Sequence, residues 1–323
     1  MSNTAEYENK AMSGVMLMQW IIGIDGGGTR TVGWAADLEG KILGRVENGS
    51  GNYHTTGLPN FTAVMAGVID ELAVGCNVKK TDLQVVSLGL AGVDRISDKQ
   101  IILETLTQLG LPCQYLVNSD AKIAMVAGLG KAEGIILIAG TGSIAYGINK
   151  QGEIIRAGGW GHLASDEGSG YAIGHQALVR GIRSAEGRDK ATILLGMIME
   201  NLSLKSWDEM VGTINSPAMS KAKVASLAQL VAAAAAQGDQ VASEILMQAG
   251  NELASLVESV IIRGFSQREL VQVCIFGGVV SNIPLVRKQV EELLADKAII
   301  VSSQSQPVAG AVSLALEFTK GNI

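Results

Sequence analysis

The 323-residue chain is long enough for two domains, because one domain takes roughly 100–200 residues. Hydrophobic residues make up 47% of the chain and charged residues only 17%, a balance that favours a buried core and excludes intrinsic disorder. The formal net charge of −6 argues against a nucleic-acid partner, which would require a basic surface. We therefore expect a folded, two-domain protein that does not bind nucleic acid.

The chain opens with a polar, weakly patterned stretch, and residues 1–17 are predicted to be a disordered extension. The first apolar run, 15–24, contains Gln19 and ends at Asp25, well short of the ~20 residues that cross a bilayer. It also lacks the small-residue cleavage site of a secretory signal. We therefore predict a strand here, no membrane partner and a cytoplasmic location.

Cysteine and histidine show no metal-binding pattern. The three cysteines, Cys76, Cys113 and Cys274, are far apart in apolar surroundings and are predicted to be reduced core residues. The histidines show no HExxH or related spacing, which argues against a zinc site built by the protein.

Two segments of the chain repeat one pattern. IIGIDGGGTRTVGWAADLEGKIL (21–43) and IILIAGTGSIAYGINKQGEII (135–155) each read as strand, glycine loop, strand, tight turn and strand. A duplicated hairpin with a glycine-rich tip predicts two similar α/β domains that face one another.

Helices and strands alternate along the rest of the chain. The hydrophobic periodicity predicts, in order, a helix at 60–75, strand 83–90, helix 98–109, strand 114–118, helical tracts at 170–181, 188–201 and 220–262, strand 271–278, helix 283–295, strand 298–301 and helix 307–319. Pro307 is expected in the first turn of the last helix, a position that proline tolerates. The boundary near Ser119 is predicted to be a hinge, and the apolar helices of 220–262 could form a homodimer face.

The first glycine loop, DGGGT (25–29), follows a strand. Its backbone N–H groups could approach a phosphate, and Thr29 adds a hydroxyl donor. Asp25 would be useful beside a phosphate only with Mg²⁺ between them. The alternative is a β-turn whose Asp bonds the loop backbone.

Two further glycine turns strengthen the phosphate interpretation. AGTGS (139–143) lies at the equivalent place in the repeat, so the two loops could hold the two ends of a triphosphate. FGGVVSN (276–282) could let an adenine or ribose lie against the backbone, or could be a tight turn with Ser281 or Asn282 capping the next helix. The spacing matches neither a Walker loop nor a Rossmann fingerprint.

Asp120 follows a predicted strand and starts a predicted helix. It is either a helix N-cap, a common role for Asp, or a general base at the proposed hinge. The segment GGWGHLASDEGSGYAIGHQAL (158–178) is dense in glycine. Trp160 on its loop could stack on the face of a sugar or a base. Asp166 and Glu167 could simply be helix-start acids.

These motifs give the chain a family resemblance over about 20–318. GIDGGGTRT, NSDA, LIAGTGS and above all the 158–178 segment resemble the N-acetylglucosamine kinases of the BadF/BadG/BcrA/BcrD-type ATPase family, in the actin/hexokinase-like superfamily. The resemblance implies an α/β fold of two actin/hexokinase-like (ribonuclease H-like) domains with an active-site cleft between them. It implies an N-terminal domain over 18–119, completed by the C-terminal helix at 304–323, and a C-terminal domain over 120–303.

The resemblance also implies roles for individual residues. ATP contacts fall on Gly27, Thr29, Thr141, Gly142, Gly277 and Gly278. Sugar contacts fall on Asn52, Asp120, Gly159, Trp160 and Asp166. Asp120 is the implied catalytic base, and Asp25 the implied Mg²⁺ residue, acting through water.

The sequence departs from the family pattern in two loops. Ala91–Gly92–Val93 stands where the family's sugar kinases often carry a serine, and NYHTT (52–56) differs from the animal enzymes' Asn-His-Trp. The cysteine pattern of the iron–sulfur dehydratase activators is missing, as is the zinc motif of ROK sugar kinases. We therefore expect ATP-dependent phosphorylation of an amino sugar, N-acetyl-D-glucosamine first, with N-acetylmuramic acid kinase, glucosamine kinase or a sugar-independent activator ATPase as alternatives.

Overall fold

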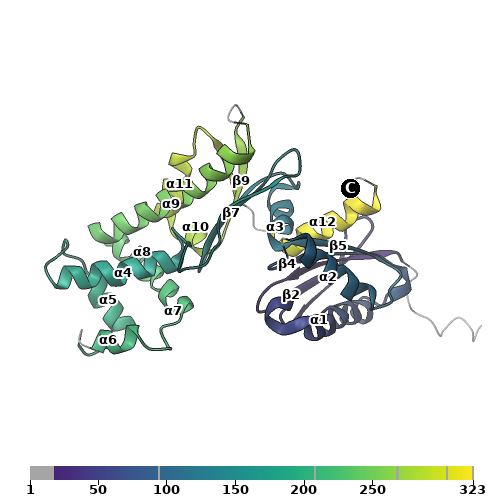
Figure 1. The fold of residues 1–323 in the computed structure, drawn as a ribbon, viewed down its shortest axis with the longest axis horizontal. Coiled ribbons are helices and arrows are strands. Elements are labelled where there is room, and N and C mark those ends of the chain that lie inside the picture. Colours follow the sequence, from purple (N-terminus) through teal and green to yellow (C-terminus); the bar gives the residue numbers. More distant parts are fainter. Residues whose placement is uncertain (1–17, 94, 207–208, 267–268, 303–304, 322–323) are drawn as a thin grey trace, which may run out of the picture. The chain divides into compact units, whose positions relative to one another are not determined.

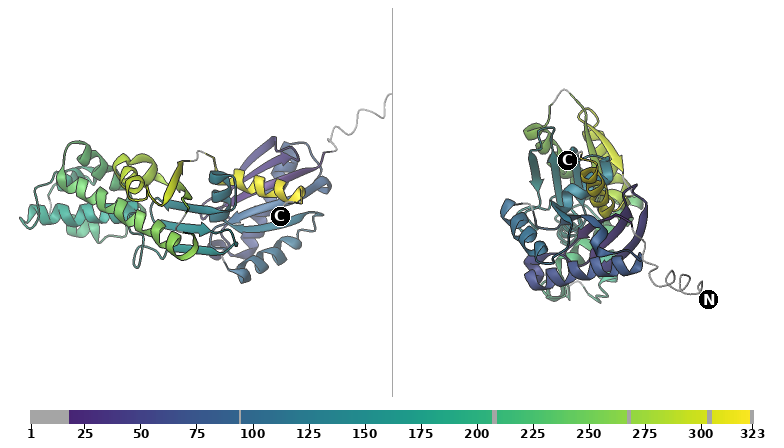
Figure 2. Two further views of the ribbon diagram at one scale, coloured as in Figure 1. Left: turned by 90° about the horizontal axis from the view of Figure 1, so that it is seen from above. Right: turned by 90° about the vertical axis from the view of Figure 1, so that its right-hand side faces the viewer.

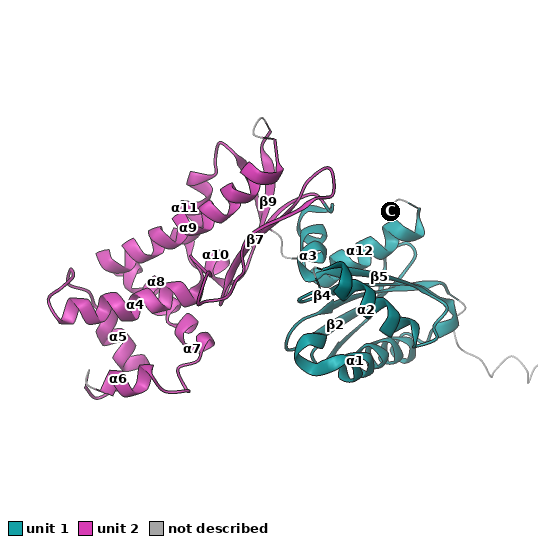
Figure 3. Cartoon of the chain, in the orientation of Figure 1, with its two compact units in different colours: residues 1–132, 304–323 teal, residues 133–303 magenta. Residues whose placement is uncertain are grey.

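The computed structural model describes residues 18–321 apart from 94, 207–208, 267–268 and 303–304. The predicted disordered extension, 1–17, lies outside the described residues. The chain divides into two compact units (Figure 3): unit 1 is Met1–Ala132 with Gln304–Ile323, and unit 2 is Glu133–Ser303.

Unit 1 is a mixed five-stranded sheet with helices on both faces (Figure 1). Its elements are β1 (Trp20–Gly26), β2 (Thr31–Asp37), β3 (Ile42–Asn48), α1 (Tyr53–Gly75), the 3₁₀ helix η2 (Lys80–Asp82), β4 (Leu83–Leu90), α2 (Ile96–Thr107), β5 (Gln114–Ser119), α3 (Asp120–Leu129) and α12 (Pro307–Thr319). The strand order is β3-β2-β1-β4-β5, with β1, β4 and β5 parallel.

The two-residue period of β1 explains the layers of unit 1. Trp20, Ile22 and Ile24 pack in one core cluster with the buried faces of α1 and α2. Ile21 points to the opposite face and packs with α12. Figures 1 and 2 show α12 lying beside these strands, so residues from the end of the chain complete the N-terminal unit.

Unit 2 repeats the same architecture. Its elements are β6 (Gly134–Ala139), β7 (Ser143–Ile148), β8 (Ile154–Gly158), α4 (Gly170–Ala185), α5 (Leu194–Asn201), α6 (Glu209–Ile214), α7 (Lys221–Ser226), α8 (Ala228–Ala236), α9 (Gln240–Gly264), β9 (Val271–Phe276), α10 (Gly278–Asn282), α11 (Pro284–Leu293) and β10 (Ala298–Ser302). The strand order is β10-β9-β6-β7-β8. Read from the other edge of the sheet, it is the order of unit 1 with β1 to β5 replaced by β6 to β10. The internal repeat predicted from the sequence is therefore a repeat of topology.

Helix α9 is the core helix of unit 2. Among the described helices of at least 18 residues, it alone is apolar enough by composition to cross a membrane. Half of its most apolar window is buried, and its buried residues belong to the main hydrophobic cluster of the unit. Its apolar character is thus explained by packing against the sheet and the neighbouring helices.

Two predicted helical tracts are shorter or more broken than the periodicity indicated. The tract 220–262 is three helices, α7, α8 and α9, and Gly238, with φ +87°, separates α8 from α9. The tract 188–201 becomes helical only at Leu194. Asp239 accepts hydrogen bonds from the Thr192 hydroxyl (2.8 Å) and the Ile193 N–H (2.8 Å), which holds the preceding residues in a turn.

Unit 1 also continues past the boundary that we predicted near Ser119, because α3 packs with α12. A Cβ added to Gly310 of α12 would lie 1.9 Å from the carbonyl oxygen of Ile123 on α3, so the two backbones are in close contact. Ile123 and Val126 share a buried cluster with Leu314 of α12. The predicted bounds 18–119 and 120–303 stay a prediction, while the contacts place α3 with the first unit.

Candidate active site

The carboxyl ends of three parallel strands bring the first glycine loop and Asp120 to one edge of the unit 1 sheet. Gly26 of β1, Leu90 of β4 and Ser119 of β5 lie in register across the sheet. Neighbouring strands are about 4.8 Å apart, so Asp120, the residue after Ser119, starts only two strands from the glycine loop. Ligands of open α/β sheets bind at such carboxyl edges.

The first glycine loop is braced by the chain that leads into α1. The Gly27 N–H donates to the Arg30 carbonyl (2.9 Å), and the Gly51 N–H donates to the Gly27 carbonyl (3.1 Å). A Cβ on Gly51 would lie 2.8 Å from the Gly26 Cα, so position 51 needs glycine for this approach. Thr29 lies exposed at the tip of the loop, where its hydroxyl can meet a ligand.

Asn52 follows Gly51 and is therefore held beside the first glycine loop. It is the N-cap of α1, and its side-chain oxygen accepts the His54 N–H (3.0 Å). The cap occupies the oxygen and leaves the amide N–H₂ as the group suited to a ligand. The predicted sugar contact of Asn52 stays a prediction, and the amide donors are suited to it.

Asp25 lies at the end of β1, partly buried beneath the loop. Burial raises the pKa of its carboxyl above the usual 3.8, and the nearby Arg30 guanidinium lowers it. Within the described ranges, no hydrogen-bond donor reaches this carboxylate. A partly buried carboxylate without such a donor would be stabilised by a hard cation, so Asp25 is suited to hold Mg²⁺ through water, and the ion would supply positive charge for phosphate.

Asp120 is the first residue of α3, but it is not the N-cap. Ser119 fills that role, because its hydroxyl accepts the Lys122 N–H (3.3 Å). The Asp120 side chain is exposed, and its Oδ1 accepts the N–H of Ala121 (2.8 Å). Asp120 is therefore an exposed acid in the first turn of α3, a position that the helix dipole favours, and its predicted role as catalytic base stays a prediction.

In unit 2 the second and third glycine turns meet at the ends of the parallel neighbours β6 and β9. The Gly140 N–H donates to the Gly142 carbonyl (2.9 Å), which closes a tight loop around Thr141. Gly277 has φ +98°, and a Cβ there would lie 2.3 Å from the Ala139 carbonyl oxygen. Only glycine permits this approach, so the fold brings the predicted phosphate and adenosine loops of this unit together.

The loop after β8 is shaped by glycines and exposes an aromatic ring. Gly158, Gly159 and Gly161 all have positive φ, and the Gly159 N–H donates to the Ser143 carbonyl (3.0 Å) beside the second glycine loop. Trp160 is 70% exposed, and the Arg156 guanidinium lies 4.2 Å from its ring centroid. An exposed Trp held at the site edge suits stacking on a sugar face.

Asp166 is 4% exposed and has φ +70°, a conformation that few non-glycine residues adopt. Its Oδ1 accepts the Ser143 N–H (3.1 Å), and its Oδ2 accepts a hydrogen bond from the Lys221 ammonium (2.7 Å). The predicted sugar contact of Asp166 stays a prediction. Lys221 was not found from the sequence, because no motif links it to a residue 55 positions earlier.

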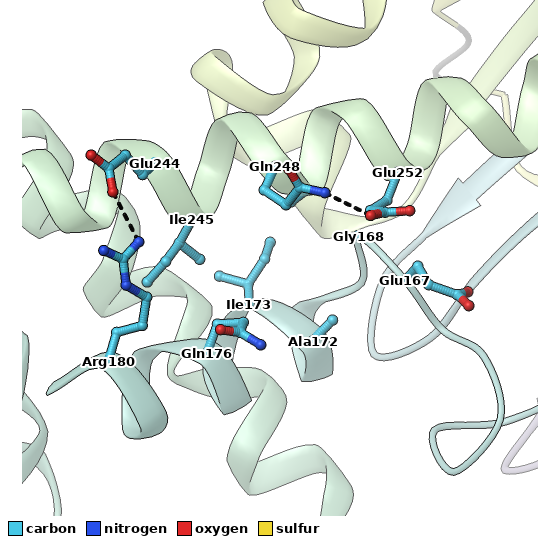
Figure 4. Close-up of a pocket in the computed structure, with 11 residues that line it drawn as sticks. Glu167, Gly168, Ala172, Ile173, Gln176, Arg180, Glu244, Ile245, Gln248 and Glu252 are labelled. Carbon is cyan, nitrogen blue, oxygen red and sulfur yellow. Dashed lines mark hydrogen bonds and ion pairs between the residues drawn. The ribbon is translucent and has the colours of Figure 1, made fainter. Parts of the chain in front are cut away.

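A cavity of about 400 Å³ lies between α4 and α9, where Arg180 bonds Glu244 and Gln248 bonds Glu252 (Figure 4). It is lined by none of the predicted site residues, although its rim includes Glu167. In the described part of the chain, no group of three or more His, Cys, Asp or Glu residues is placed to hold a metal ion.

Comparison with known proteins gives the family. The family model of the BadF/BadG/BcrA/BcrD ATPase family matches residues 22–315, which is most of the chain. The chain belongs to this family. The resemblance inferred from the motifs is thereby confirmed.

Two curated relatives of this BadF/BadG/BcrA/BcrD ATPase family member are similar over nearly their whole length. An N-acetylmuramic acid/N-acetylglucosamine kinase from Clostridium acetobutylicum is 36% identical over 301 residues, covering 92% of this chain and 98% of that protein. An N-acetyl-D-glucosamine kinase from Dictyostelium discoideum is 31% identical over 319 residues, covering 94% of this chain and 100% of that protein.

Solved structures share the fold. A candidate N-acetylglucosamine kinase from Chromobacterium violaceum aligns with TM-score 0.70 at 23% identity, over 93% of this chain and 100% of that one. A ROK hexokinase from Thermus thermophilus aligns with TM-score 0.55 at 14% identity, over 94% of this chain and 99% of that one. At these identities the similarity shows the fold, and it confirms the predicted actin/hexokinase-like α/β class.

In this family member the predicted site residues form two groups, one on each unit. The group on unit 1 lies at the carboxyl edge of its sheet and comprises Asp25, Gly27, Thr29, Asn52 and Asp120. The group on unit 2 lies around the second glycine loop and comprises Thr141, Gly142, Gly159, Trp160, Asp166, Gly277 and Gly278. Each unit thus carries at least one of the glycine loops that the sequence analysis predicted to bind ATP.

Proposed function

We propose that this chain transfers the γ-phosphoryl group of ATP to an amino sugar, with N-acetyl-D-glucosamine as substrate and its 6-phosphate as product. The observation that carries the proposal is the position of Asp120, which is exposed at the carboxyl edge of the sheet and directly follows Ser119, whose strand position is in register with Gly26 at the start of the first glycine loop. The names of the two curated relatives support the choice of substrate.

The proposed chemistry rests on Asp120 and the loops. The Asp120 carboxylate would take the proton of the sugar hydroxyl as that oxygen attacks the γ-phosphorus and the bond to ADP breaks. Thr29 and the glycine-loop amides would bind phosphate oxygens, and phosphoryl transfer depends chiefly on such placement and charge neutralisation. Mg²⁺, held by Asp25 through water, would supply positive charge at the phosphates.

The sugar contacts are part of the same proposal. Trp160 offers an apolar face, and Gly159 beside it lets the backbone of the same loop come close to a ligand. An acetamido group would gain both packing and hydrogen bonds in such surroundings. A site built for that group leaves polar atoms unpaired when the group is missing, so discrimination by a few kcal/mol is expected. ATP is a cytoplasmic metabolite, and we place the reaction in the cytoplasm.

A panel of sugars tests the proposal. ADP release is measured with N-acetylglucosamine, N-acetylmuramic acid, glucosamine, glucose and no sugar. We expect stimulation by sugar and the highest kcat/KM for an N-acetylated hexosamine. Glucose or glucosamine ahead of both N-acetylated sugars would reject the acetamido pocket, and a sugar-independent rate would favour an activator ATPase instead.

A further inference from the structure

Asp166 and the residues after it hold the second glycine loop in shape. The Gly170 N–H donates to the Gly140 carbonyl (2.8 Å), and the Ser143 hydroxyl donates to the Glu167 carbonyl (2.6 Å). The Ser143 N–H donates to the Asp166 carboxylate itself (3.1 Å). The loop predicted to bind phosphate is therefore held in shape by hydrogen bonds to residues 166–170, a segment that carries a buried negative charge.

That charge lies very close to the loop. A Cβ added to Gly142 would be 2.7 Å from Asp166 Oδ1, and the Asp166 side chain is only 5% exposed. A buried carboxylate is stable only when it is paired and hydrogen-bonded. Lys221 supplies the pairing charge, with its ammonium nitrogen 2.7 Å from Oδ2.

Lys221 does not stabilise its own helix, α7. It is the first residue of α7, where a positive charge is unfavourable because the helix dipole is positive at that end. Its helix is brought in by two glycines of α4. A Cβ on Gly174 would lie 2.0 Å from the Val224 carbonyl oxygen, and one on Gly170 would lie 3.3 Å from the Ala225 carbonyl oxygen.

We propose that Lys221 is a positioning residue for ATP, which neutralises the Asp166 carboxylate beneath the second glycine loop and so allows that loop to receive phosphate. The inference rests on the proposed function for its choice of ligand. Lys221 acts through Asp166 and need not touch the nucleotide. An unpaired carboxylate at this depth would repel the phosphate that the loop amides attract, because charges interact strongly away from water.

Four variants test the inference. Lys221→Met removes the compensating charge, Asp166→Asn removes the carboxylate but keeps an oxygen for the Ser143 N–H, and the double variant removes both charges. Lys223→Met is the matched control, because Lys223 is on the same helix and its side chain makes no contact with Asp166 in the described structure. KM for ATP and KM for the sugar are measured for each, with equilibrium binding of a fluorescent ATP analogue.

We expect Lys221→Met to raise KM for ATP, and the dissociation constant of the ATP analogue measured without sugar, by about tenfold or more. Lys223→Met should match the parent protein. The double variant should recover most of the loss in ATP affinity, because no uncompensated charge remains. A merely structural role for Lys221 would lower the free energy of unfolding of Lys221→Met without a selective loss of affinity for the ATP analogue.

Three outcomes would overturn the inference: Lys221→Met behaving like Lys223→Met, a rise in KM for the sugar alone, or a double variant as impaired as Lys221→Met. If Lys221→Met does not fold, the double variant and Lys221→Arg decide, since both should bind the ATP analogue nearly as the parent does. The binding measurement needs no sugar, so it stands even if the sugar panel shows that the proposed kinase reaction is absent.

Discussion

Replacing Asp120 by Asn separates a catalytic base from a structural carboxylate. The amide cannot take the proton of the sugar hydroxyl, so kcat should fall by about 10²–10⁴-fold, the usual contribution of general base catalysis. The Asn side chain keeps an oxygen that can accept the Ala121 N–H, now 2.8 Å from Oδ1. KM for the sugar should therefore stay within about tenfold of its original value.

The effect of the same change on stability can be worked from the helix end. Ser119 carries the cap, so Asp120→Asn keeps the cap and loses the attraction between the negative charge and the helix N-terminus. That attraction is about 0.3–1 kcal/mol for an exposed group, which sets the expected loss in free energy of unfolding. Urea unfolding measures the loss, and coupled ADP release measures the turnover.

Asp239→Asn is the matched control, because Asp239 is a true N-cap. Its Oδ1 accepts the Ala242 N–H (2.8 Å) at the start of α9, and its Oδ2 accepts the Thr192 hydroxyl and the Ile193 N–H. Asn has one oxygen for these donors, so the control should lose about 1–2 kcal/mol of stability and keep its turnover. If Asp120→Asn instead behaves like this control, Asp120 is not the base.

Two other predictions concern the metal and the helix packing. ATP turnover should disappear in excess EDTA and return with Mg²⁺ or Mn²⁺, because Asp25 would otherwise repel the phosphates; full activity in EDTA would remove Asp25 from its proposed role. Gly310→Ala should destabilise the protein by about 1–3 kcal/mol or more, because the new Cβ would lie 1.9 Å from the Ile123 carbonyl oxygen. The control Gly196→Ala, in a helix where nothing lies within 4 Å of the added Cβ, should be neutral or stabilising by up to about 1 kcal/mol, and equal unfolding free energies for the two variants would contradict the packing argument.

The sequence by itself determined the features that depend on near neighbours along the chain. The two-residue period of the apolar runs and the glycine loops between them predicted both strand triplets of the repeat, now β1 to β3 and β6 to β8. Pro307 marked the start of the last helix, where the structure has it. The motifs also identified the family, because the residues that form one glycine loop are consecutive in the sequence.

Only the tertiary structure decided which distant parts meet. Nothing local in Gly310 shows that α12 packs against α3, which moves the edge of the first compact unit to Ala132. Likewise the contact of Lys221 with Asp166 arises because glycines in α4 let α7 approach, and hydrophobic periodicity carries no information about such pairing. Close backbone packing and buried charge pairs are properties of the assembled core, so they appear only once the elements are placed in space.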